Sequence, residues 1–151
     1  MRFSYFCFLQ LLFATPAAAA DVTFSGTLTG VCTLALSTPG ILGLATDGSL
    51  STSAGLPAIL AILSIGTNTL TVAPPEWVDS PPDYQPGSES LEVGYQGLAG
   101  LGLADQPLTS AETTRTISTL PLSLLTMNAR VTNSNGFTAG DYEMKTVVTC
   151  S

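Results

Sequence analysis

Three carboxylates and two aromatic rings gather in the middle of the sequence. Glu76, Asp79 and Asp83 lie around Trp77 and Tyr84 in the segment APPEWVDSPPDYQPGSES. Carboxylate pairs cleave glycosides, sugars stack on aromatic faces, and carboxylate oxygens also bind calcium. The segment lacks the spacing of an EF-hand loop, and nothing in it fixes the acids in space, so we interpret them as a solvated loop. We interpret Trp77 first as a packing anchor and second as a sugar platform, and keep Trp77 and Tyr84 as the candidate ligand-binding residues.

The composition excludes most other catalytic chemistry. The chain has no histidine, the commonest general base, so Ser-His-Asp and Cys-His sites are impossible. The segment GLAGLGLAD, residues 97–105, is similar to a phosphate-binding loop but lacks the GxGxxG spacing and a following helix or lysine. We interpret its glycines as an interruption of a strand, at a sheet edge or a bulged corner. We therefore expect no catalytic residue, no metal and no cofactor, and a protein that is not an enzyme.

The first twenty residues, MRFSYFCFLQLLFATPAAAA, have the pattern of a secretory signal peptide. Arg2 gives a charged start, an apolar stretch follows, and Ala18 with Ala20 fits the small positions of a cleavage site. The apolar stretch is short for a membrane span, and no charged stop follows it. We expect a signal peptide over residues 1–20, and a mature chain that is secreted, periplasmic or on the cell surface with no stable membrane span.

The mature chain would be strongly acidic. It keeps Arg115, Arg130 and Lys145 against eleven acidic residues, a formal charge of −8. Such a chain repels phosphate backbones and anionic lipid, so we expect no nucleic-acid partner. Residues 21–151 are long enough for a single domain with its own core.

Two cysteines remain after the leader, Cys32 near the start and Cys150 near the end. An even cysteine count in an exported chain predicts a disulfide, and here only one intramolecular pairing exists. Closing so long a loop contributes about 4–5 kcal/mol in the chain-entropy model. Both cysteines lie on the apolar parity of their segments, so we expect the first and last strands to lie side by side in one sheet.

Alternation of apolar and polar residues is the dominant pattern of the chain, and it predicts strands. It is clear in DVTFSGTLTGVCTLAL at the start, SLEVGYQG in the middle, and LSLLTMNARVTN and DYEMKTVVTC towards the end. The segment LPAILAILSIGTNTLTVAPP also fits a helical stripe, but Pro57 and the GTN turn favour a strand, a turn and a second strand paired as a hairpin. Many short strands with glycine and proline turns predict an all-β sandwich or barrel.

The two ends resemble chaperone-usher pilins and their spore-coat-U-like relatives. Such domains open with V-x-F-x-G-x-L before a cysteine and close with A-G-x-Y followed by a threonine and valine strand. The matching residues here are Val22, Phe24, Gly26 and Leu28 before Cys32, then Ala139, Gly140, Tyr142, Thr146, Val147, Val148 and Thr149. The resemblance implies an immunoglobulin-like antiparallel β-sandwich. It covers only the two ends of the mature chain.

The resemblance also implies a function and partners. A pilus (fimbrial) subunit is an exported, non-enzymatic structural module, used in cell adhesion, whose partners are like subunits or a periplasmic chaperone. The chain departs from the family because cleavage before Asp21 leaves almost no N-terminal extension to donate to a neighbour, and because pilin disulfides join two strands near the N-terminus. The alternative from the residues alone is a secreted ligand-binding module, with carbohydrate at Trp77 and Tyr84.

The leader generates the first testable prediction. Exported protein should begin at Asp21, because the alanine run ends there and strand alternation starts at once. Intact-mass and N-terminal peptide mass spectrometry of secreted or periplasmic material would measure this directly. Exported protein that retains Met1 would contradict the prediction.

Overall fold

The computed structural model describes residues 25, 30–97, 103–118 and 120–151. The expected signal peptide and the glycines of residues 98–102 lie outside this part. The described residues form twelve strands and no helix, so the prediction of an all-β chain is confirmed. The strands are β1 (Val31–Thr38), β2 (Ile41–Leu44), β3 (Leu50–Leu56), β4 (Ala58–Ile65), β5 (Asn68–Val72), β6 (Glu76–Asp79), β7 (Glu89–Gly97), β8 (Gln106–Thr109), β9 (Thr113–Ile117), β10 (Leu120–Asn133), β11 (Glu143–Lys145) and β12 (Val148–Cys150). No helix that could cross a membrane is found in the described residues.

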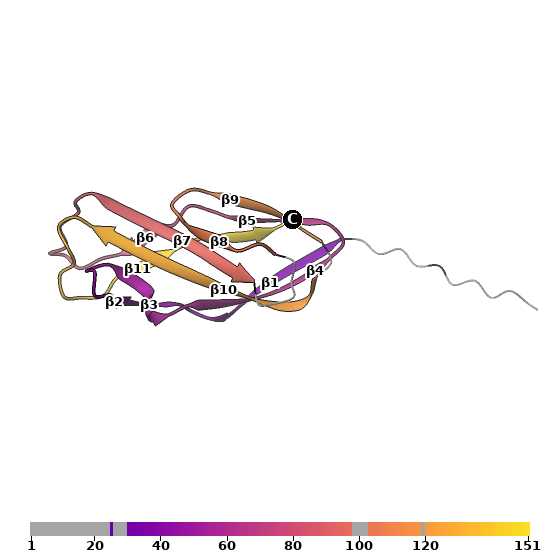
Figure 1. Cartoon of the computed structure of the whole chain (residues 1–151), viewed down its shortest axis with the longest axis horizontal. Helices are drawn as coiled ribbons and strands as arrows, with labels where there is room; N and C mark the ends of the chain where they lie inside the picture. Colours follow the sequence, from indigo (N-terminus) through magenta and orange to yellow (C-terminus); the bar gives the residue numbers. More distant parts are fainter. Residues whose placement is uncertain (1–24, 26–29, 98–102, 119) are drawn as a thin grey trace, which may run out of the picture.

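The largest sheet has seven antiparallel strands built around β10. One edge of β10 pairs with β4 and, further along, with β3, while its other edge pairs with β7. β1 pairs with β4, β2 with β3, and β8 with β7, so the outermost strands are β1, β2 and β8. Figure 1 shows β7 and β10 side by side along the molecule, with β5 and β9 on one side of them and β2 and β3 on the other.

Two prolines interrupt neighbouring segments of this sheet at the same level. Pro39 separates β1 from β2, and Pro57 separates β3 from β4. Thr38 pairs with Ile59 before the break, and Ile41 pairs with Leu56 after it. Proline has no N–H to donate to a ladder, so each proline interrupts its strand where the other strand is interrupted too.

A second run of strands is interrupted in the same way. β5 pairs with β9 on one side and β12 on the other, and β6 pairs with β11. Pro74 and Pro75 separate β5 from β6, opposite the gap between β11 and β12. The predicted single last strand is therefore two short ones, and the predicted surface loop of residues 73–90 contains the strand β6.

The segment read as a hairpin contains the two predicted strands, β4 and β5, but they do not pair with each other. β4 belongs to the seven-stranded sheet and β5 to the three-stranded one, so the turn at Gly66 is a corner between sheets. Gly66 adopts a φ of 80°, a value that glycine reaches without steric cost because it has no Cβ. The side chain of Asn68 fixes the corner by donating hydrogen bonds to Ser64 Oγ at 2.8 Å and the Ile65 carbonyl at 3.1 Å.

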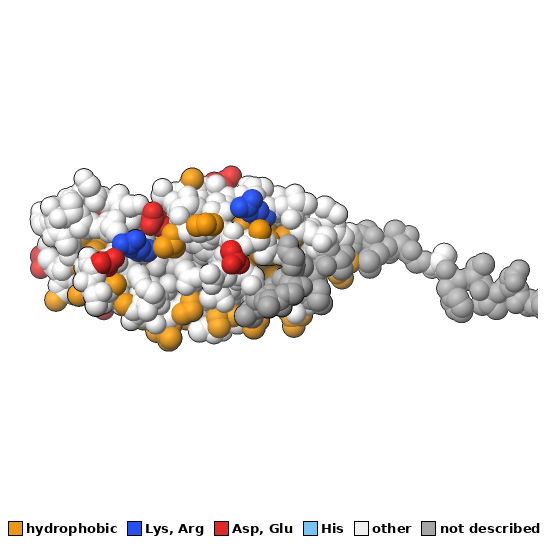
Figure 2. Space-filling model, in the orientation of Figure 1, with side chains coloured by type: hydrophobic (Ala, Val, Ile, Leu, Met, Phe, Trp, Pro, Cys, Tyr) orange, Lys and Arg blue, Asp and Glu red, His pale blue; other side chains and the backbone are white. Residues whose placement is uncertain are grey.

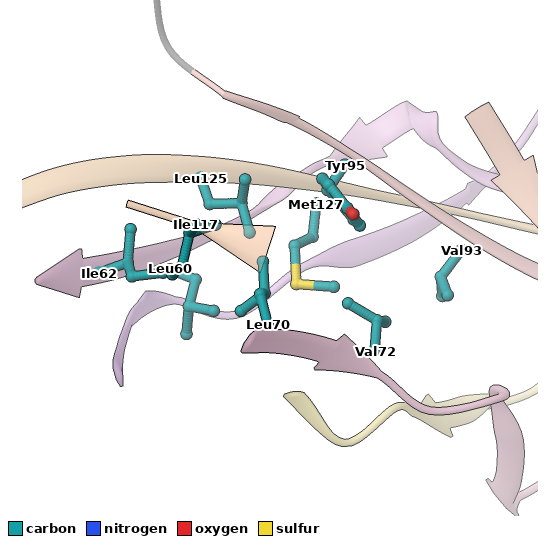
Figure 3. Close-up of a cluster of buried hydrophobic side chains, with 9 residues drawn as sticks. All are labelled: Leu60, Ile62, Leu70, Val72, Val93, Tyr95, Ile117, Leu125 and Met127. Atoms are coloured by element: carbon teal, nitrogen blue, oxygen red, sulfur yellow. The ribbon is translucent and has the colours of Figure 1, made fainter. Parts of the chain in front are cut away.

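The core lies between these two sheets. Side chains from β4, β7 and β10 of the larger sheet meet side chains from β5 and β9 of the smaller one, and Figure 3 shows Met127 extending from β10 towards Leu70 and Val72. The buried members are Leu60, Ile62, Leu70, Val72, Val93, Tyr95, Ile117, Leu125 and Met127. Each lies on one parity of its strand, as a pleated sheet with one buried face requires.

The predicted disulfide is present, and it joins the two sheets. Cys32 of β1 and Cys150 of β12 have Cα atoms 5.8 Å apart. The prediction that their strands pair in one sheet is wrong, since β1 pairs with β4 and β12 with β5. Cys32 lies opposite Ser64 and Cys150 opposite Leu70, on either side of the Gly66 corner, where the sheets have just separated and a bridge can span them.

Removing this bridge generates the second prediction. In a chain that begins at Asp21, the double change Cys32→Ser and Cys150→Ser should lower the free energy of unfolding by about 2–5 kcal/mol, because the unfolded chain regains the entropy of a loop closed across 118 positions. Denaturant unfolding under non-reducing conditions measures the loss, and reduced wild-type protein should match the variant. Two titratable thiols in the denatured, unreduced wild type would contradict the bridge.

Candidate functional site

The aromatic candidates belong to a cluster of four rings at the end that holds β6 and β11. Trp77 lies 6.0 Å from Tyr84 and 5.8 Å from Tyr142, measured between ring centroids. Phe137 stacks on Tyr84 at 6.0 Å with 7° between the ring planes, and it forms a T-shaped pair with Tyr142 whose ring centroids lie 5.5 Å apart. All four side chains are half-buried, so much of each ring is covered by the others.

Polar contacts fasten the two loops that carry these rings. The Asn133 side chain donates to the Gln85 carbonyl at 3.0 Å and accepts from the Gly87 N–H at 2.9 Å. Gly140 lies against Pro81, where a side chain would collide with the proline ring. The A-G-x-Y turn thus packs on the proline-rich segment. The arrangement explains how so irregular a segment holds its aromatic rings in place.

Hydrogen bonds hold the two tyrosine hydroxyls inside the cluster. Tyr84 donates to the Glu89 carboxylate, and Tyr142 donates to the Thr138 carbonyl at 3.0 Å. Burial of Tyr84, together with the hydrogen bond and charge of Glu89, raises the pKa of the Tyr84 hydroxyl well above its ordinary value. Tyr84 therefore stays neutral at physiological pH, and its hydroxyl is already engaged within the chain.

Each of the three acids in the proline-rich segment has its own local partner. Glu76 forms an exposed ion pair with Lys145 at 3.1 Å, Asp79 accepts from the Ser80 N–H at 2.8 Å, and Asp83 faces the Thr138 hydroxyl at 3.5 Å. In the part of the chain that the structure describes, no group of three or more acids or cysteines could hold a metal ion. Each of the three acids therefore already has a partner within the chain.

A second candidate is a polar trough on the outer face of the seven-stranded sheet. Its floor is formed by β7 and β10, one wall by β3 with the turn before it, and the other wall by β8. Its volume is about 390 Å³. β8 approaches so closely because residue 94 is glycine: a Cβ there would lie 2.7 Å from the carbonyl oxygen of Gln106.

One ion pair and its hydrogen bonds organise the rim of this polar trough. Arg130 Nη2 lies 2.7 Å from Asp47 Oδ2. Asp47 Oδ1 accepts from both the N–H and the hydroxyl of Ser49, at 3.0 and 2.6 Å. These two hydrogen bonds, and then Arg130, lower the pKa of the Asp47 carboxyl, so it is ionised at neutral pH.

The third feature is an apolar outer face over β1, β4 and β10. Side chains on the parity opposite to the core point away from it, and on these three strands most are apolar. Leu122 is 74% exposed, while Val31 and Leu124 are each 39% exposed. The face consists of Val31, Ala35, Ile59, Ala61, Leu63, Ile65, Leu122 and Leu124, with Thr33 and Thr126 among them.

The structure brings together only some of the residues singled out from the sequence. Trp77 and Tyr84 are in contact, but Phe137 was missed as their neighbour because it lies more than fifty positions along the chain. The polar trough has no sequence signal at all, since its lining comes from four separate strands and the turn before β3. The apolar face had a signal, the run AILAILSI of β4, which is apolar except for Ser64 and fits a strand covered on both faces.

The aromatic cluster generates the third prediction. Trp77→Ala should lower the free energy of unfolding by about 2–4 kcal/mol, because Trp77 contacts two other rings and its loss leaves a gap among them. Trp77→Phe, the matched control, should retain most of that stability. Denaturant unfolding measures both. Unchanged stability in Trp77→Ala, with loss of sugar binding instead, would favour the platform interpretation.

No protein-family model, no curated protein and no solved structure matches this chain. These searches therefore neither support nor oppose the resemblance of the two chain ends to pilins. The function has to follow from the three surfaces of the molecule itself.

Proposed function

We propose that the chain is an exported, non-enzymatic structural module of immunoglobulin-like β-sandwich fold that assembles with like subunits at the cell surface, as pilus subunits do. The observation that carries the proposal is the apolar outer face over β1, β4 and β10. Two packed sheets with a disulfide between them support the sandwich. The resemblance of the chain ends supplies the surface setting.

The apolar outer face is contiguous, and this favours its burial against a partner. Val31 pairs with Ile65 on this face, and Ala35, Ala61 and Leu124 form one row across the three strands. Apolar patches of this kind on exported proteins mark interaction sites, since water is poorly tolerated over so many neighbouring apolar side chains. Figure 2 also shows hydrophobic side chains along the lower edge of the molecule, where Figure 1 places β2 and β3, two strands of the same sheet that are not part of this face.

The absence of charged residues from the apolar face permits a second copy as the partner. The chain carries a formal charge of −7 with its leader, so two copies repel each other wherever their acidic residues meet. The apolar face holds no charged residue. Two chains can therefore approach through this face without placing like charges together, and both contribute apolar area to the contact.

A free strand edge lies beside the same face. β1 pairs with β4 only, so the other edge of Val31–Thr38 has no strand partner among the described residues. Such an edge offers backbone donors and acceptors to a further strand. The apolar face and the free edge of β1 thus point to one side of the molecule as the side of assembly.

Self-association gives the fourth prediction. The chain that begins at Asp21 should associate with rising concentration in sedimentation-velocity runs and in native mass spectra. Leu122→Glu or Leu124→Glu should raise the concentration needed by about tenfold or more, because a carboxylate would be buried without a partner in the contact. Both side chains point outward, so the fold should survive, as circular dichroism can verify.

Thr114→Glu is the matched control. Thr114 is exposed on β9 of the other sheet, and the change adds the same charge away from the apolar face. This variant should associate like the wild type. A wild-type chain that stays monomeric at every concentration would sink the proposal and leave the ligand-binding alternative.

A further inference from the structure

We propose that the polar trough between β3 and β8 binds a neutral carbohydrate. The proposal is independent of assembly through the apolar face, because the two surfaces share only β10 and use different parts of it: residues 122–126 in the apolar face and residues 128–130 in the trough. Its volume of about 390 Å³ falls at the lower end of the range of small-ligand pockets, about 300–1,000 Å³. It is open to solvent, so a ligand can enter without any movement of the chain.

Uncommitted amide groups on the floor of the trough supply hydrogen bonds. The Gln96 side chain is exposed and makes no hydrogen bond to any described residue. Asn128 accepts a long hydrogen bond of 3.4 Å from the Thr52 hydroxyl through Oδ1, and its NH₂ group has no partner in the described chain. Each amide therefore offers donors, and Gln96 also a free carbonyl oxygen, towards the trough.

Hydroxyl groups extend the same chemistry along the β3 wall. Ser51 and Ser53 share a hydrogen bond between their hydroxyls, and both line the trough. A sugar hydroxyl donates one hydrogen bond and accepts others, as these serine hydroxyls do. Amides and hydroxyls side by side therefore match a polyhydroxylated ring better than a ligand that can only accept or only donate.

The ion pair at the rim decides against charged ligands. An anion would have to compete with Asp47 for Arg130 in a chain whose overall charge is negative. A cation would have to displace Arg130 from Asp47. A neutral ligand leaves the 2.7 Å pair intact and can bond to its outer atoms, because the side chains of Arg130 and Asp47 remain 39% and 53% exposed.

The lining contains no aromatic ring, so stacking adds nothing to affinity. Hydrogen bonds exchanged with water contribute little each, so we expect dissociation constants in the millimolar range for single sugars. Repeated copies at a surface would strengthen binding to a multivalent glycan without any new contact.

The test is a nuclear magnetic resonance titration of the ¹⁵N-labelled chain that begins at Asp21. The probes are the methyl glycosides of mannose, galactose, glucose and N-acetylglucosamine. For at least one probe, amide shift changes should be confined to residues 49–53, 94–96 and 128–130. Gln96→Ala and Asn128→Ala should weaken that binding about tenfold, as expected for the loss of hydrogen bonds to the ligand.

Gln85→Ala is the matched control, because it removes the same amide from the loop beside Tyr84. Binding should be unchanged in this variant. If Asn128→Ala disturbs the sheet through Thr52, Gln96→Ala decides alone, since its exposed side chain has no hydrogen bond within the described residues to lose.

Three results would overturn the proposal. The first is the absence of shift changes in the trough with all four glycosides. The second is binding that Gln85→Ala weakens and Gln96→Ala leaves intact, which would move the site to the aromatic cluster. The third is a stronger response of the trough to inorganic phosphate or sulfate than to any neutral glycoside.

Discussion

Strand β4 is apolar on both faces, and much of the molecule is arranged around that constraint. Leu60 and Ile62 of β4 enter the core, and its edges are paired by β1 and β10. The same strand ends at the Gly66 corner, which sends the chain into the second sheet. Because one face of β4 closes the core, its other apolar residues are left outside, and they account for half of the apolar outer face. The position of this one strand thus helps to stabilise the fold and also leaves an apolar surface exposed.

The sequence was sufficient to find the strands but not to find their partners. Alternation identified residues such as Leu125, Met127 and Val131 as core-facing, and they are buried. Alternation says which face a residue takes, and nothing about which strand lies beside it. The hairpin error at residues 58–72 and the single-sheet error for Cys32 and Cys150 have this one cause. The side-chain bonds of Asn68 that turn the chain between sheets have no general signature in a single sequence.

The candidate sites show the same limit more sharply. Trp77 and Tyr84 could be noticed because they are near neighbours in the sequence, whereas Phe137 joins them only through folding. The trough could not be foreseen, since Ser51, Gln96 and Asn128 become neighbours only when β3, β7 and β10 align. The pairing of the cysteines was predictable because only two remain after the leader, and they can pair in only one way. The position of the disulfide at the Gly66 corner was not predictable.

Along β10, the outward residues change character in the middle of the strand. Leu122 and Leu124 are apolar, Thr126 carries both a methyl and a hydroxyl group, and Asn128 and Arg130 are polar. The change falls where the partner of β10 switches from β4, which ends its pairing at Met127, to β3, which pairs from Arg130, and this is also where Pro57 interrupts the chain. The apolar and the polar outward residues of β10 therefore meet at the level of Pro57. A second copy that covers the apolar residues would leave the trough open, so assembly and ligand binding need not compete on this face.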